Sequence, residues 1–407
     1  MALQPFARVS QSQLKMRTHK TTFGLLALVL GSALPAQVPV QRIQERTGAL
    51  PDGFSQLTAI QELLDGRAVV ADTRDRTLFI VDFTARNASK LGRTGSGPNE
   101  YRMLGPLVRG AADTVFMLDF AGRRLHIITP QGTLNGSRIF DVALSDTVRG
   151  ERQPAGTARV VGGPRYMDAR GRLYHEVTYL DRDRGGVSAQ SYILRLDPVT
   201  GDSRVVAPLM RWYPDHSARW RAPLMTQDVW TVAPDGRVAR IVPVDYHVEW
   251  YRDNALAVAG PAVAYRPVPV TGADRDAYRA ARAAQRPGGA SISGPPAGGN
   301  TATDPPRRSA PASGDVTDAE FPRVKPPFVE DFVGTVARIS PEGDVWVSRS
   351  RAHGDSVTTV DVFNSSALLT RQVALPAHRV LLGFGRGVLY LGRTDDDGLQ
   401  WLERYRR

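Results

Sequence analysis

The most constraining feature of the chain is a strand–turn–strand unit that recurs six times. Each unit has a glycine-containing turn, a short apolar strand, and a second strand whose apolar residues alternate. Glycine suits these tight turns because it adopts positive φ without a Cβ penalty. The strand pairs are Ala68–Asp72 with Thr77–Phe83, Val115–Leu118 with Arg124–Thr129, Leu173–Val177 with Ser191–Leu196, Val238–Val242 with Asp245–Tyr251, Val345–Ser348 with Thr359–Phe363, and Val388–Leu391 with Leu399–Tyr405.

Repeats of four short strands at about 40–50 residues are typical of a β-propeller. Helical periodicity is nearly absent, so the core is expected to be all-β. We therefore predict a six-bladed β-propeller with four-stranded antiparallel blades. The sixth unit stops at Arg407 without a fourth strand, and Val38–Glu45 has no local partner. We expect this N-terminal strand to close the ring, which removes both edges; an unpaired stub is the alternative.

An insertion interrupts the repeat. Blades one to four are expected over residues 37–271, and blades five and six over 328–407, so that 272–327 separates them. The insertion starts with a predicted short helix, Asp274–Ala284. Residues 287–318 are rich in Pro, Gly, Ser, Ala and Thr. Because such a composition buries too little apolar area to offset chain entropy, we predict a disordered linker there.

The N-terminus has the pattern of an export signal. Basic residues from Arg17 to Lys20 precede an apolar run, Phe23–Leu30, and small residues end at Ala36. We predict a signal peptide over residues 1–36, with Met16 as an alternative start. The apolar run is shorter than the roughly 20 residues of a spanning helix, so no stable membrane span is expected; an uncleaved anchor is the alternative. The chain has no cysteine, which excludes a lipid-anchor cysteine and disulfides. These features predict a periplasmic or secreted protein.

The net charge of +11 raises the question of nucleic-acid binding. Residues 1–36 contribute four of these charges, so +7 remains without them. The other arginines are interleaved with acids, as in Arg74, Asp75 and Arg76. Nucleic-acid binders instead gather positive charge on one face or in one tail. We therefore expect no nucleic-acid partner.

A glycine-rich element follows the first unit and reads Gly92-Arg-Thr-Gly-Ser-Gly-Pro-Asn-Glu-Tyr101. It resembles a Gly-Arg-x-Gly-x-Gly-Pro-x-Glu-aromatic element found in this position in exported bacterial six-bladed β-propellers related to the NHL and TolB-like groups. Where that family often has glycine, this chain has Asn99, which also adopts left-handed geometry. The resemblance covers roughly residues 38–405 without the insertion. It implies the fold, and it carries over no catalytic residue.

Three blade-to-blade connections are expected to share one face and to form the rim of the central channel. They are residues 93–101, 211–221 and 272–327. The second alternates aromatic and basic side chains, which suits sugars or peptides. The predicted ligand-binding residues are Arg93, Glu100, Tyr101, Trp212, Tyr213, His216 and Trp220. The alternatives are that the tryptophans pack under their own loop, and that Glu100 and Tyr101 cap the turn and pack between blades.

Signatures of catalysis are weak. His175-Glu176 lacks the second histidine of a zinc protease motif, and Asp395–Gly398 lacks the later ligands of a calcium loop. The sequence contains no phosphate-binding loop, dinucleotide fingerprint or Gly-x-Ser-x-Gly elbow. We therefore predict no catalytic residue, no metal-binding residue and no cofactor.

The sequence thus favours a monomeric exported module that binds a protein, peptide or carbohydrate and does no chemistry of its own. An alternative is a metal-dependent enzyme of the lactonase or lyase kind. In that case carboxylates, Asn and His around the channel would hold Ca²⁺ or another divalent metal. A third possibility is a scaffold whose residues 287–316 recruit a partner.

Overall fold

A computed structural model describes residues 38–119, 121–139, 147–148, 151–152, 157–161, 163–181, 187–209, 223–224, 227–285, 316–329 and 336–407. The described residues belong to one compact unit, Val38–Arg407. The predicted signal peptide and residues 287–315 of the predicted linker lie outside them. No helix in the described ranges is long and apolar enough to cross a membrane.

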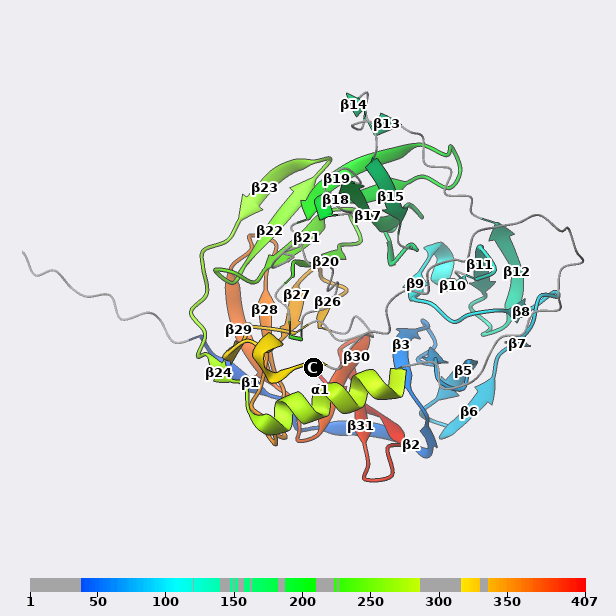
Figure 1. Cartoon of the computed structure of the whole chain (residues 1–407). Helices are drawn as coiled ribbons and strands as arrows, with labels where there is room; N and C mark the ends of the chain where they lie inside the picture. The colour runs from blue at the N-terminus through cyan, green and yellow to red at the C-terminus, as the bar shows by residue number, and fades with distance from the viewer. Residues whose placement is uncertain are drawn as a thin grey trace, which may run out of the picture. The chain divides into compact units, whose positions relative to one another are not determined.

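Six antiparallel blades form a ring, which confirms the predicted six-bladed β-propeller (Figure 1). Blades one and two are β3 (Leu57–Glu62), β4 (Ala68–Asp72), β5 (Thr77–Asp82) and β6 (Asn87–Lys90), and β9 (Leu107–Arg109), β10 (Val115–Asp119), β11 (Arg124–Ile128) and β12 (Leu134–Ile139). Blade three has β15 (Thr157–Val161) and β16 (Tyr166–Met167), which both pair with β17 (Leu173–Asp181), then β18 (Val187–Leu196) and β19 (Ser203–Leu209); blade four has β20 (Val229–Val232), β21 (Val238–Val242), β22 (His247–Arg252) and β23 (Ala255–Ala259). Blade five has β26 (Ala337–Ile339), β27 (Val345–Ser348), β28 (Thr359–Phe363) and β29 (Leu369–Ala374), and blade six has β30 (Arg379–Gly385), β31 (Val388–Thr394), β32 (Gln400–Arg406) and β2 (Arg46–Phe54). A separate hairpin joins β13 (Thr147–Val148) to β14 (Glu151–Arg152).

An N-terminal strand closes the ring as predicted, but the prediction chose the wrong residues. The closing strand is β2, which pairs antiparallel with β32 of the sixth blade. The predicted segment Val38–Glu45 instead supplies β1 (Val40–Arg42), a parallel fifth strand on β29 of the fifth blade. Burial explains the difference, because Leu50 and Phe54 in β2 are only 3% and 4% exposed, whereas all of β1 is exposed.

The core lies between neighbouring blades, where apolar residues from both sheets meet. Buried tyrosine–carboxylate pairs add polar ties across these contacts. Tyr246 of blade four donates to Asp361 Oδ2 of blade five at 2.6 Å. Tyr390 of blade six donates to Glu62 Oε2 of blade one at the same distance. Because each tie satisfies groups that are costly to bury alone, it fixes how adjacent blades sit.

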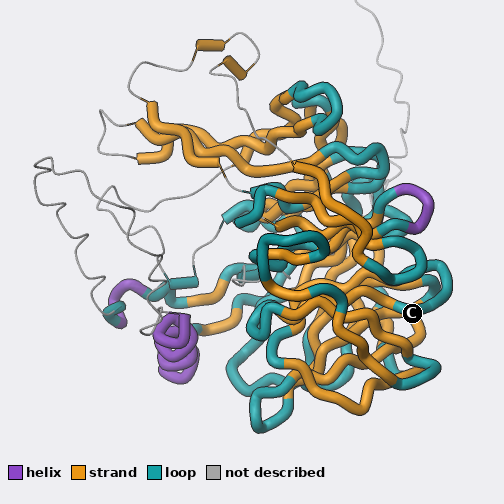
Figure 2. The backbone as a smooth tube through the Cα atoms, turned by 90° about the vertical axis from the view of Figure 1, so that its right-hand side faces the viewer, coloured by secondary structure: helices purple, strands orange, loops and turns teal. Residues whose placement is uncertain are grey.

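In the described part of the insertion lies one α-helix, α1 (Gly272–Gln285), which overlaps the predicted helix. Its first turn has a capping arrangement, since the Asp274 amide donates to Thr271 Oγ1 and Thr271 donates back to the Asp274 carboxylate. Lys325 also contacts Asp274, at 2.6 Å. Lys325 lies in β25 (Val324–Lys325), which pairs with β24 (Val268–Pro269), while η2 (Asp318–Glu320) is a short 3₁₀ turn. Figure 2 shows α1 at one face of the blades.

Candidate functional site

The glycine-rich motif forms a loop that is held by its own acidic residue. Its ends pair in parallel as β7 (Arg93–Thr94) and β8 (Glu100–Tyr101). The Glu100 carboxylate accepts from Arg93 Nε at 2.6 Å and from the Gly97 amide at 2.7 Å. The Gly97 amide, followed by Arg93, lowers the pKa of Glu100. The carboxylate therefore stays charged and organises the loop.

Tyr101 anchors this loop to the blades. Its side chain is 1% exposed and packs among apolar residues of blades one and two. Its hydroxyl accepts from the Leu78 amide at 3.0 Å, and burial raises its pKa. Arg93 is the accessible member of the motif, because its side chain is 81% exposed. The predicted ligand contact of Tyr101 would thus need the loop to open, whereas Arg93 is open to solvent.

Gly92 is required where the motif begins. Its φ is +70°, and a Cβ there would meet the Leu134 side chain and lie 2.8 Å from the Asn99 carbonyl oxygen. We expect Gly92→Ala to lower the free energy of unfolding by about 2–4 kcal/mol, from left-handed strain plus overpacking. Gly66→Ala is the matched control: its φ is +89° with no atom within 4 Å, so about 1 kcal/mol is expected. Urea unfolding of both variants measures the difference, and equal losses would show that the close approach is unimportant.

Two buried aspartates that the sequence analysis did not single out hold the chain where it enters a blade. Asp72 ends β4 and accepts from the Ser55 and Gln56 amides at 2.7 and 3.0 Å. Asp119 ends β10 and accepts from the Arg102 and Met103 amides at 2.7 and 3.1 Å. Both aspartates are 1% exposed. In the sequence, both aspartates end the second strand of successive repeat units, and this shared position could have identified them.

A cavity of about 420 Å³ lies beside the motif. Ser96–Asn99 line one part of it, and Arg124, Gly136 and Ser137 of blade two line the other. Arg124 Nη1 donates to Ser137 Oγ at 3.1 Å, which orients the guanidinium group. The hydroxyl groups of Ser96 and Ser137, the amide of Asn99 and the guanidinium of Arg124 are side chains of these lining residues, and such groups are suited to a hydroxylated or carboxylate-bearing ligand.

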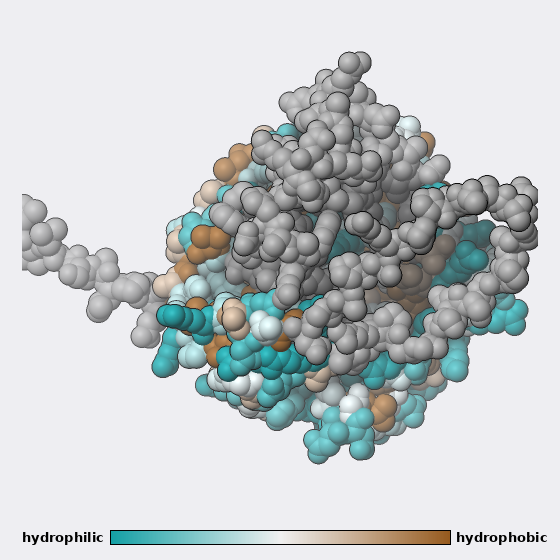
Figure 3. Space-filling view, viewed as in Figure 1, coloured by the Kyte–Doolittle hydropathy of each residue, from teal (hydrophilic) through white to brown (hydrophobic). Residues whose placement is uncertain are grey.

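The aromatic half of the predicted site falls outside the described residues. Trp212, Tyr213, His216 and Trp220 all lie within 210–222, so their ligand role stays a prediction. Strand β19 ends before this connection, and β20 begins after it. In the view of Figure 3, hydrophilic residues predominate on the part of the surface around α1 that is visible.

Blade four carries a charged network near the start of β20. Arg240 is 8% exposed and contacts Asp228 Oδ2 at 2.6 Å and Glu249 Oε2 at 3.2 Å. Glu249 continues the network, with Oε1 at 3.3 Å from His247 Nε2. Burial alone would lower the pKa of Arg240, but Asp228 and Glu249 outweigh it and raise that pKa. Two carboxylates around one guanidinium make this a structural tie across the blade rather than a free acid–base pair.

No three His, Cys, Asp or Glu side chains of the described residues are grouped so that they could hold a metal ion. Two weak signatures have structural positions. His175 is fully buried in β17. Asp395 closes a hairpin turn with Gly398, and both of its carboxylate oxygens are used, since Oδ2 accepts from Trp401 Nε1 at 2.6 Å and Oδ1 from the Leu399 amide at 2.9 Å.

Comparisons with known proteins give only distant likenesses. No protein-family model and no curated protein matches the chain. Among solved structures it is similar to a calcium-binding protein, regucalcin, from Agrobacterium tumefaciens (12% identity, 91% of this chain and 97% of that one, TM-score 0.38). It is also similar to a DUF4221 member from Bacteroides vulgatus (9%, 88% and 95%, 0.43) and to PQQ-bound aldose sugar dehydrogenase from Streptomyces coelicolor (12%, 89% and 97%, 0.43). These likenesses assign no activity to the chain.

Proposed function

We propose that this protein is an exported propeller of the NHL and TolB-like kind that binds a ligand on the face formed by its blade-to-blade connections. The observation that carries the proposal is the cavity of about 420 Å³ beside the motif. Because the loop is fixed by its own residue Glu100, its residues Ser96–Asn99 can line the site with little ordering cost on binding. The proposed site of action is the periplasm or the outside of the cell, after removal of residues 1–36.

The chemistry of this face favours a protein, peptide or carbohydrate ligand. The exposed Arg93 and the cavity-lining Arg124 supply guanidinium donors. Aromatic side chains from Trp212 and Trp220 would add flat surfaces on which sugar rings or peptide side chains pack. Such a site binds through several moderate contacts and needs no nucleophile or general base.

The test is a binding screen with purified protein against immobilised glycans and peptides. Arg124→Gln and Trp212→Ala are expected to weaken a hit about tenfold or more, from loss of a charged hydrogen bond or an aromatic contact. Arg86→Gln is the control, because Arg86 is an exposed arginine in a hairpin turn at the end of β5. Melting temperatures should stay within a few degrees of the parent.

Two outcomes would contradict the proposal. If Trp212→Ala and Trp220→Ala both unfold the protein, those residues belong to the core and not to a site. If purified protein carries about one equivalent of a divalent metal and hydrolyses lactones, the enzyme alternative replaces simple binding.

A further inference from the structure

A second cavity, of about 490 Å³, lies where blades five and six meet the N-terminal segment. Its walls come from the end of β1, the crossover to β2, the connection from β29 to β30, and the end of β32. It shares no lining residue with the cavity beside the motif. We propose that this cavity binds an organic anion that carries carboxylate groups on an apolar body.

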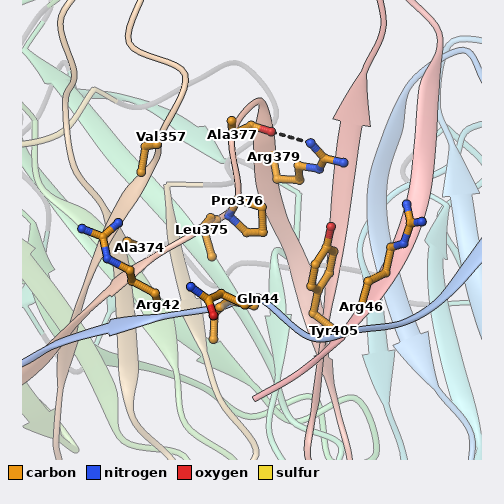
Figure 4. A pocket seen from close by; sticks show the side chains of 11 residues that line it. Arg42, Gln44, Arg46, Val357, Ala374, Leu375, Pro376, Ala377, Arg379 and Tyr405 are labelled. Carbon is orange, nitrogen blue, oxygen red and sulfur yellow. Dashed lines mark hydrogen bonds between the residues drawn. The ribbon is translucent and has the colours of Figure 1, made fainter.

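The charge of the lining is the first argument. Three arginines, Arg42, Arg46 and Arg379, line the cavity, and no carboxylate is among its lining residues. Figure 4 shows Arg42 on one side of the pocket and Arg46 and Arg379 on the other, with Gln44 and Tyr405 between them. A ligand that spans the pocket therefore meets positive charge at both ends.

The buried Glu403 gathers arginine side chains at one end of the cavity, away from Arg42 (Figure 4). Its carboxylate accepts from Arg379 Nε and Nη2 at 2.9 and 3.1 Å and from Arg46 Nη1 at 3.2 Å. Tyr405 donates to the same carboxylate at 2.8 Å. Arg393 Nε lies 3.7 Å from the same carboxylate, so one negative charge faces three arginines and leaves the region positive overall. Because the Arg379 guanidinium already donates to Glu403, it is not free to contact a ligand and acts as a positioning residue.

Arg42 is the guanidinium that remains for a ligand. Among the described residues, none forms a hydrogen bond or ion pair with its side chain. Its main chain is nevertheless fixed, because Arg42 pairs with Ala374 in the sheet and the next residue, Ile43, is 4% exposed in the core. A planar guanidinium on a fixed backbone matches the two oxygens of a carboxylate.

The floor of the cavity is apolar. Leu375 and Pro376 lie between the arginines, with Val357 at the rim. Such a floor offers contact area beside the exposed guanidinium group of Arg42. It also accepts the hydrocarbon part of a ligand, and the volume lies within the range of small-molecule pockets. A short-chain mono- or dicarboxylate satisfies both requirements.

Isothermal titration calorimetry with adipate, hexanoate and the neutral hexanamide tests the proposal. Both acids are expected to bind at low salt and hexanamide is not, and raising the salt to about 0.3 M should weaken the acids. Arg42→Gln should raise the dissociation constant of adipate about tenfold. Gln44→Glu places a carboxylate in the pocket and should reduce binding at least as much. Arg86→Gln is the matched control and should bind like the parent.

The variants are at exposed positions, so they are expected to fold, and their melting curves are recorded with the titrations. The proposal is overturned if neither acid binds up to about 10 mM, which is weaker than a specific small-molecule site. It is equally overturned if Arg42→Gln and Gln44→Glu, with unchanged melting curves, bind adipate as tightly as the parent. Binding of hexanamide as tight as that of hexanoate would show that charge plays no part.

Discussion

A chain that begins at Ser55 is expected not to form a closed propeller, whereas one that begins at Gln37 folds. The shorter chain lacks β2, so the long strand β32 keeps β31 but loses its outer partner and becomes the open edge of the blade. It also loses Leu50 and Phe54, whose burial contributes roughly 3–6 kcal/mol together. That amount approaches the whole stability of an ordinary domain. We expect aggregation, measured by size-exclusion chromatography, and loss of a cooperative thermal transition.

A chain that begins at Arg46 is the control, because it lacks β1 but keeps β2. It loses the burial of Ile43, about 1.5–3 kcal/mol, and the exposed residues of β1. This chain should stay monomeric and unfold cooperatively at a lower temperature than the chain from Gln37. If the chain from Ser55 melts like the chain from Gln37, closure by β2 does not hold the ring together.

The blades could be predicted because their strands obey local rules. In the first blade the turn at Gly66 and the apolar runs of β4 and β5 follow directly from residue type and alternation. The closing strand, β2, does not follow this alternation. Its pairing with β32 shifts register twice, between Arg46 and Gly48 and between Ala49 and Gly53, so that no regular alternation marks it. The sequence therefore favours the segment just before it, Val38–Glu45, as the closing strand.

In the candidate sites too, some features could be predicted from the sequence and others depend on how the blades pack. The motif could be located because glycine and proline mark its turn; the shared ligand-binding face expected from the repeat stays a prediction. The bond from the Leu78 amide to Tyr101 could not be foreseen, since it depends on how two blades pack. The cavity lined by Arg42 and Arg379 had no sequence signal at all. These residues meet only because the N-terminal segment crosses from blade five to blade six.

Glu403→Gln is expected to lower the free energy of unfolding by about 3 kcal/mol at pH 7. The Glu403 side chain is 2% exposed and pairs with Arg379, Arg46 and Arg393, so glutamine would leave three guanidinium groups without this counter-charge. Burial alone raises the pKa of Glu403, but its hydrogen bonds from Arg379 and Tyr405 outweigh burial and hold the pKa below the ordinary 4.5. The charge is therefore favoured by the fold.

Because the fold lowers the pKa of Glu403, the stability that this residue contributes depends on pH. A carboxyl whose pKa is lower in the folded state binds fewer protons there than in the unfolded chain. Its contribution is fully present above the ordinary pKa of 4.5 and is lost as the pH falls through the lower folded value. Urea unfolding should thus show a large gap between the parent and Glu403→Gln at pH 7, and the gap should close as the pH falls below about 4.

Glu342→Gln is the matched control, because Glu342 also pairs with one arginine, Arg407, at 2.6 Å, but its side chain is 53% exposed. The hydrogen bond from Arg407 lowers the pKa of Glu342 to about 2. Water screens such an exposed pair, so we expect a loss of less than about 1 kcal/mol. Equal losses in the two variants would mean that burial adds nothing to the Glu403 contacts. A gap for Glu403→Gln that does not change with pH would mean that lost packing, and not lost charge, destabilises the protein.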